Sequence, residues 1–215
     1  MKAAIKRIAS AVLMTTVLLA SAGTAYADEE MEAREAERAA SYEVVPDTNN
    51  IEGWPKGPQV YGNSAIVMDM NSGAVLYAKK PDERHYPASI TKLMTALVAL
   101  ENASLEDEVY FSEASVSFLA YGDASIGMTP GEILSMNDAL YGMLLASANE
   151  VSYAIAESVG KLTGGGFDTF IQKMNDRAEE IGCTGSHWVN ANGLHDEQHY
   201  TTAHDMALIA SKVYQ

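Results

Sequence analysis

The sequence predicts an α/β fold in which a short β-hairpin precedes a mostly helical region. Two apolar stretches, Ser64–Met70 and Ala74–Ala78, flank Asn71-Ser72-Gly73, a composition typical of a hairpin turn. A helix is predicted next, because apolar residues recur at helical spacing at Ile90, Leu93, Met94, Leu97 and Val98. Since two strands are not stable alone, we expect the hairpin to need further strands or a helix packed across it.

The N-terminus has the pattern of a secretory signal peptide. Positive residues at Lys2, Lys6 and Arg7 precede a mostly apolar stretch, and Ala25-Tyr26-Ala27 has the small residues of a signal peptidase site. We therefore expect residues 1–27 to be a signal peptide and the chain to be exported, to a periplasm or to the cell surface. An uncleaved membrane anchor is the alternative interpretation.

Charge and cysteine content exclude several classes of protein. The formal net charge is −15, which argues against binding to nucleic acid and against electrostatic docking on anionic lipid. Cys183 is the only cysteine, so no intramolecular disulfide can form. We expect Cys183 to be a small buried apolar side chain rather than a reactive thiol.

The remaining chain is predicted to be one spacer followed by one domain. Residues 28–53 are rich in Glu, Ala and Arg and are interpreted as an acidic spacer, either solvated or a frayed helix. Residues 54–215 would form the domain, mainly helical from Ala103 onward. Three helices have clear terminal signals: a capping box at Ser135–Asp138, a helix over Asp168–Ile181 before Gly182, and a helix starting near Thr202.

A candidate nucleophile and base stand at the start of the first helix. Ser89 and Lys92 are three residues apart and share one helix face. A serine hydroxyl needs an adjacent base, and a lysine serves as one when burial and the positive end of the helix dipole lower its pKa. A second Ser-x-x-Lys, at Ser158 and Lys161, lies at a helix C-terminus, where the dipole stabilises the cation instead. The location therefore favours Ser89.

Ser147-Ala148-Asn149 is a second candidate element, of the form Ser-x-Asn. Ser135-Met136-Asn137 has the same form, so the pattern alone has little weight. Ser147 also begins a Ser-x-x-Glu sequence with Glu150, which is typical of a capping box. A capping role and a catalytic role both remain open for Ser147, and they are compatible.

Four blocks in order make the chain resemble the D,D-carboxypeptidase family of low-molecular-weight penicillin-binding proteins (peptidase S11). Ser-x-x-Lys and Ser-x-Asn are two of the three motifs that such proteins share with class A β-lactamases. The similarity extends from about Trp54 to Gln215. The blocks are Tyr86-Pro87-Ala88-Ser89-Ile90-Thr91-Lys92, Leu140–Asn149, Asn190-Ala191-Asn192-Gly193-Leu194 and His199–Ala207.

The resemblance implies a serine β-lactamase/transpeptidase-like α/β fold and a D-Ala-D-Ala carboxypeptidase activity. Ser89 would attack the bond between two D-alanines of a peptidoglycan stem peptide and form an acyl-enzyme that water hydrolyses. Lys92 would act as the base, Ser147 would relay a proton, and Asn149 would hold Lys92 and the substrate amide. β-Lactams would acylate Ser89 as substrate mimics, and no metal or organic cofactor is implied.

The sequence departs from the family pattern at two places. Glu150 stands where members often have Asp, which keeps the charge. The third motif, Lys-Thr-Gly, does not occur in these 215 residues. In the family it lies on a downstream strand that binds the substrate carboxylate and supplies one oxyanion donor, so we expect a C-terminally truncated chain that is inactive and poorly folded. A membrane anchor, common in the family, would lie beyond Gln215.

Two other functions are compatible with the sequence. A class A-like β-lactamase shares the first motif, although the Asn190–Asp205 region argues against it. A non-catalytic peptidoglycan-binding protein would keep the fold without the third motif. The histidines His195, His199 and His204 have spacings that fit no common metal-ligand pattern, and we expect no metal site there.

Overall fold

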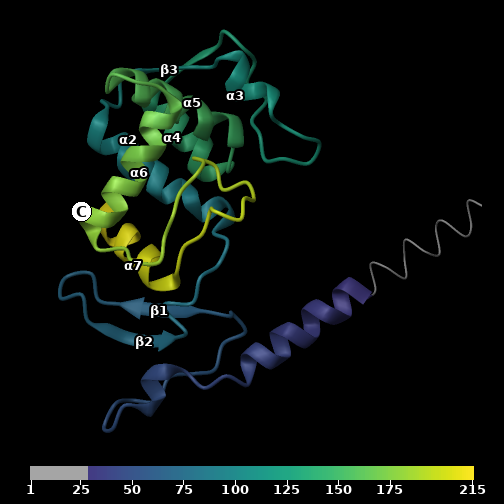
Figure 1. Ribbon diagram of the computed structural model, residues 1–215, viewed down its shortest axis with the longest axis vertical. Helices are drawn as coiled ribbons and strands as arrows, with labels where there is room; N and C mark the ends of the chain where they lie inside the picture. The colour runs from purple at the N-terminus through teal and green to yellow at the C-terminus, as the bar shows by residue number, and fades with distance from the viewer. Residues whose placement is uncertain (1–28) are drawn as a thin grey trace, which may run out of the picture. The chain divides into compact units, whose positions relative to one another are not determined.

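The computed structural model describes residues 29–215, which divide into two compact parts, residues up to 63 and Ser64–Gln215 (Figure 1). The predicted signal peptide and its cleavage site lie outside the described residues. No helix within 29–215 is both long enough and apolar enough to cross a membrane.

The first part consists of a helix and an irregular segment folded back on it. Residues 29–42 are helical and are exposed through residue 40. The short 3₁₀ helix η1 (Asp47–Asn50) follows. The return segment contacts the helix where the Tyr61 ring stacks on Tyr42 at 4.5 Å and the Ser41 hydroxyl donates to the Gly62 carbonyl at 2.9 Å.

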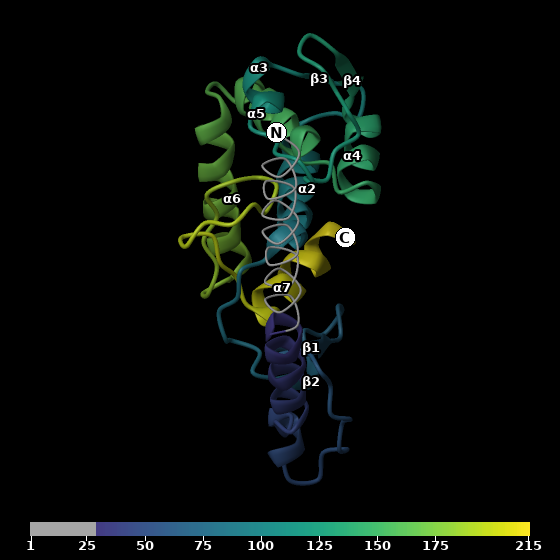
Figure 2. The same ribbon diagram turned by 90° about the vertical axis from the view of Figure 1, so that its right-hand side faces the viewer.

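The second part opens with the predicted hairpin. Strands β1 (Ala65–Met68) and β2 (Val75–Lys79) are antiparallel and pair Ala65 with Lys79. The Asp69 carboxylate accepts hydrogen bonds from the backbone N–H and the hydroxyl of Ser72, which fixes the turn. Within the described residues these two strands pair only with each other. Helix α7 (Ala203–Val213) packs against β1, as Figures 1 and 2 show, and supplies the cover that a hairpin requires.

Helix α2 (Thr91–Asn102) is the centre of the second part. It follows directly on the 3₁₀ turn η2 (Ala88–Ile90), so the first predicted helix has a tighter first turn than expected. Met94, Leu97 and Val98 are buried, which confirms the apolar stripe, whereas Ile90 is exposed. Contacts with α4, α5, α6 and α7 surround α2 (Figure 2).

The prediction of a mainly helical chain after Ala103 missed a second small sheet. Strands β3 (Glu108–Tyr110) and β4 (Ile133–Ser135) pair antiparallel, with Val109 opposite Leu134. Each strand has three residues, so neither has enough length to establish a period-two pattern. The short helix α3 (Glu113–Ser117) lies between them in sequence, with Ser112 as its N-cap.

Three helices complete the core, and their ends agree with the sequence signals. They are α4 (Met136–Leu145), α5 (Asn149–Leu162) and α6 (Phe167–Ile181). The Ser135 hydroxyl accepts from the Asp138 N–H and caps α4, and Gly182 ends α6 with a left-handed φ of 97°. Both predictions are confirmed, as is the Thr202 cap of α7.

An irregular segment, residues 183–202, crosses from α6 to α7 and returns to the start of α2. The buried Asp205 carboxylate holds it by accepting from the Thr184 and Gly185 N–H groups and from the Ser186 hydroxyl. The Trp188 ring is 1% exposed and anchors the same segment in the core. The segment is therefore as well fixed as a regular element.

Candidate active site

Ser89 lies in the η2 turn, at the junction with α2, and its side chain is exposed. The residue before it, Ala88, has a φ of 48°, a left-handed conformation that a residue with a side chain rarely adopts. Strain of this kind costs about 1–3 kcal/mol and persists only where surrounding contacts enforce it. The turn therefore fixes the position of the Ser89 hydroxyl and leaves it accessible to solvent.

The Lys92 amine is buried and joins three segments of the chain. Its Nζ lies 3.1 Å from Ser89 Oγ, 2.9 Å from Asn149 Oδ1 and 2.8 Å from the Asn192 carbonyl. Burial lowers the pKa of Lys92 to about 8, and the negative charge of Glu150 opposes that shift. With a pKa of about 8, about a tenth of the amine is neutral at pH 7, and this neutral form, in contact with the serine hydroxyl, is the one that can take the Ser89 proton.

Asn149 is the first residue of α5 and is buried against Lys92, whereas Ser147 precedes the helix in an unusual backbone conformation. Ser147 has a φ of 57°, and the N-cap of α5 is Ala148. The capping-box interpretation of Ser147 and Glu150 is therefore wrong. The Ser147 hydroxyl forms no hydrogen bond with Ser89 or Lys92 within residues 29–215.

The Glu150 carboxylate, which the capping box would direct to the helix N-terminus, points instead to a neighbouring loop. Its Oε1 accepts from the Ser125 hydroxyl at 2.8 Å and from the Ile126 N–H at 2.7 Å. Glu150 is fully buried. Glu150 thus lies directly beside the candidate site, next in sequence to Asn149.

The loop Asn190–Leu194 contributes a ligand of the amine that the sequence did not single out. The Asn190 side chain accepts from the Gly193 N–H at 2.7 Å, which shapes a turn and directs the Asn192 carbonyl to Lys92. The sequence marks Asn-Ala-Asn-Gly as a motif. Nothing in it indicated a role for a backbone oxygen, because a carbonyl leaves no trace in residue type.

Gly193 makes the closest approach to the nucleophile turn. A Cβ at Gly193 would lie 1.8 Å from the Ala88 carbonyl oxygen and 3.0 Å from the Ser89 nitrogen, and the residue has a φ of 90°. Only glycine permits both the contact and the backbone conformation. The loop therefore braces the strained Ala88–Ser89 peptide from outside.

The three histidines considered for a metal site have separate environments. His199 is buried, bonds the Thr91 hydroxyl at 2.8 Å, and burial lowers its pKa to about 4, so it is a neutral structural link between α2 and the crossing segment. His204 pairs with Asp82, and the His195 ring meets Tyr86 edge-on. The residues described here contain no cluster of three metal-ligating side chains.

Two other sequence features have structural roles. The Ser158 hydroxyl accepts from the Tyr110 N–H, and Lys161 pairs with Glu157 at 2.9 Å, so the second Ser-x-x-Lys forms no nucleophile–base contact. The Cys183 thiol is half-buried, and burial raises its pKa to about 12, which keeps it protonated and unreactive at neutral pH.

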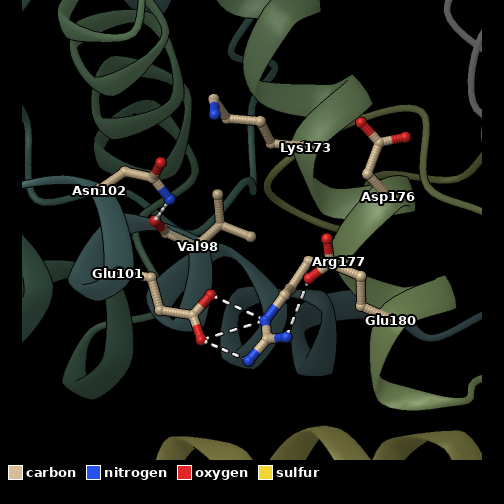
Figure 3. Close-up of a pocket in the computed structure, with 7 residues that line it drawn as sticks. All are labelled: Val98, Glu101, Asn102, Lys173, Asp176, Arg177 and Glu180. Atoms are coloured by element: carbon tan, nitrogen blue, oxygen red, sulfur yellow. Dashed lines mark hydrogen bonds and ion pairs between the residues drawn. The ribbon is translucent and has the colours of Figure 1, made fainter.

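A pocket between α2 and α6 is distinct from this site. Figure 3 shows Arg177 reaching across it, with its guanidinium bonded to Glu101 on α2 and to Glu180 on α6. The Arg177–Glu101 pair is bidentate, at 2.8 to 3.1 Å, and connects the two helices. Neither Ser89 nor Lys92 lines this pocket.

Comparison with known proteins places this geometry in a family context. Residues 52–215 match the family described as D-alanyl-D-alanine carboxypeptidase, Peptidase_S11. The chain is 36% identical to the D-alanyl-D-alanine carboxypeptidase DacF of Bacillus subtilis over 70% of its own length and 38% of that relative's. The chain thus spans well under two thirds of this relative.

Two solved structures have a similar fold. The D-alanyl-D-alanine carboxypeptidase DacD from Francisella tularensis has 32% identity and a TM-score of 0.66, covering 75% of this chain and 39% of its own. Penicillin binding protein 5 from Haemophilus influenzae has 30% identity and a TM-score of 0.67, covering 74% and 47%. The α/β fold predicted from the sequence is therefore confirmed, as part of the larger transpeptidase-like architecture.

We predict that Gly193→Ala lowers the rate at which a penicillin acylates Ser89 by about 100-fold, the cost of misplacing a reacting group by roughly 1 Å. The new methyl group would displace Ala88 and with it the nucleophile. Stopped-flow acylation of the intact gene product measures this rate. Gly164→Ala is the matched control, because Gly164 has a nearly equal φ of 91° but open space around its Cβ position. Equal losses in both variants would contradict the bracing role of Gly193.

Proposed function

Since the chain belongs to the D-alanyl-D-alanine carboxypeptidase family, peptidase S11, we propose that it is the catalytic region of a serine D-Ala-D-Ala carboxypeptidase acting on peptidoglycan stem peptides. The observation that carries the proposal is the contact of an exposed serine hydroxyl with a buried amine, Ser89 with Lys92, at 3.1 Å. The pKa of Lys92, lowered by burial to about 8, suits that amine to act as a base.

In the proposed mechanism, the neutral Lys92 amine takes the Ser89 proton while Ser89 Oγ bonds to the carbonyl carbon between the two D-alanines. The resulting ammonium then returns a proton to the leaving amine, the C–N bond breaks, and free D-alanine departs. An ester to Ser89 remains. Water attacks this ester, gives its proton to Lys92, and the serine oxygen is reprotonated as the shortened peptide leaves. No cofactor is needed to balance these steps.

The other predicted residues have supporting roles in this proposal. Asn149, whose side-chain oxygen contacts Lys92 at 2.9 Å, would orient the amine, and its NH₂ group would remain available to a substrate carbonyl. Ser147 would relay a proton between Lys92 and the leaving amine once substrate is bound. Its left-handed backbone and its position two residues before Asn149 support a constrained place at the rim of the site.

We further propose that the peptide ending in D-Ala-D-Ala is bound on the extracytoplasmic side of the membrane, in the periplasm or at the cell surface. The signal-like N-terminus supports this location. The formal net charge of −15 argues against nucleic acid as a partner. β-Lactams would react with Ser89 as mimics of the same peptide.

We predict that a fluorescent penicillin labels the intact gene product on Ser89. Ser89→Ala is expected to abolish the labelling, because among residues 29–215 the Ser89 hydroxyl is the only one that contacts Lys92. Gel fluorescence with peptide mapping measures this. Ser158→Ala, in the second Ser-x-x-Lys, is the matched control and is expected to label normally. Full labelling of Ser89→Ala would refute the assignment, and rapid turnover of the penicillin would indicate a β-lactamase.

A protein consisting of residues 1–215 alone is expected to label at least about 100-fold more slowly, the usual cost of one missing oxyanion donor. The reason is that these residues include no Lys-Thr-Gly, the motif that the family uses to bind the substrate carboxylate and complete the oxyanion hole. The labelling rate of this segment, compared with that of the intact gene product, tests the expectation. Equal rates would show that the third motif is dispensable for acylation.

A further inference from the structure

Glu150 is a buried carboxylate that no step of the proposed mechanism uses. It is 0% exposed and lies in the first turn of α5, directly after Asn149. Its Oε1 accepts two hydrogen bonds, but its Oε2 is buried and has no hydrogen-bond partner within the described residues. A carboxylate in such a place carries a desolvation cost, and stability alone is often served better by an apolar side chain. Stability alone therefore does not explain a carboxylate at this position.

The two hydrogen bonds attach one loop to the candidate site. Residues 124–127 are exposed, and three polar contacts tie them to α5. The Asn149 N–H donates to the Ala124 carbonyl at 2.8 Å, and the other two contacts are those of Glu150 Oε1 with Ser125 and Ile126. Glu150 thus supplies two of the three links between this loop and the segment that bears Ser147 and Asn149.

Glu150 also acts on the amine of the site. Lys92 is approached by Ser89 from η2, by Asn149 from α5 and by the Asn192 carbonyl from the crossing segment, all of which are uncharged. Glu150 is the charged group that interacts with it, and its attraction raises the pKa of Lys92 against the larger effect of burial. Because the carboxylate is shielded from solvent, water and salt screen this attraction only weakly.

We propose that Glu150 is a positioning residue of the site, whose carboxylate fastens the 124–127 loop beside Asn149 and supplies the fixed negative charge that balances the buried Lys92. The catalytic part of this proposal rests on the proposed function. Its two physical consequences, a fixed loop and a shifted Lys92 pKa, can be measured without any catalytic turnover. The loop is held as a wall of the site next to the Ser-x-Asn element. The negative charge of Glu150 keeps the pKa of the Lys92 amine from falling as far as burial alone would lower it.

Two variants separate these consequences. Glu150→Gln keeps the size of the side chain and removes the charge, so the pKa of Lys92 is expected to fall by about half to one pH unit. Glu150→Asp keeps the charge and shortens the side chain, so amide hydrogen exchange at residues 124–127 is expected to rise at least tenfold while the pKa of Lys92 stays close to that of the unaltered protein. An NMR titration of ¹³C-labelled lysine and hydrogen-exchange mass spectrometry of the intact gene product measure both quantities.

The matched control is Glu157→Gln on the same helix. Glu157 also accepts from a serine hydroxyl, that of Ser112 at 2.6 Å, but it does not act on Lys92. The Glu157→Gln variant should change neither the pKa of Lys92 nor the amide hydrogen exchange of residues 124–127. A Lys92 pKa that is the same in Glu150→Gln and the unaltered protein, or unchanged exchange in Glu150→Asp, would overturn the proposal. If the Lys92 pKa falls in Glu150→Gln and exchange rises in Glu150→Asp, but the unaltered protein is not labelled by penicillin, only the proposed function is refuted.

Discussion

The site depends on the burial of one amine. Lys92 lies in the first turn of α2, and its Nζ contacts oxygens from three separate segments: η2, α5 and the Asn190–Leu194 loop. A charged ammonium is costly in such a place, so burial favours the neutral form, and the same contacts fix where that form can act. The surrounding fold can be understood as the means of bringing these three segments to one nitrogen.

A different set of contacts holds each of these segments beside Lys92. The η2 turn is held by the close approach of Gly193, which only glycine allows. The crossing segment is secured by the Asp205 carboxylate and by the link from His199 to Thr91, next to Lys92 in sequence. Helix α5 packs on α2 through the main apolar core and carries Asn149 and Glu150 at its first turn. Packing thus sets the approximate distances, and a few polar contacts set the final geometry.

The sequence predicted the parts of this arrangement that depend on residue type and period. The hairpin, the apolar stripe of α2, the caps at Ser135 and Thr202, and the nearness of Ser89 to Lys92 all follow from local patterns. Three features did not follow: the three-residue strands β3 and β4, the carbonyl of Asn192, and the direction of Glu150. The strands are too short to show a period, the carbonyl belongs to every residue, and Glu150 matched a capping box whose helix in fact begins one residue later. Tertiary contacts decide all three.

The most direct test of this account is the pH dependence of Ser89 acylation by a penicillin in the intact gene product. Because burial lowers the pKa of Lys92 to about 8, the neutral amine becomes the major form only above that pH. If the neutral Lys92 amine is the base, the rate constant rises through a single ionisation near pH 8 and then levels off. A rate that keeps rising toward the ordinary lysine range above pH 10, or one that does not depend on pH, would contradict the role of Lys92 as the base.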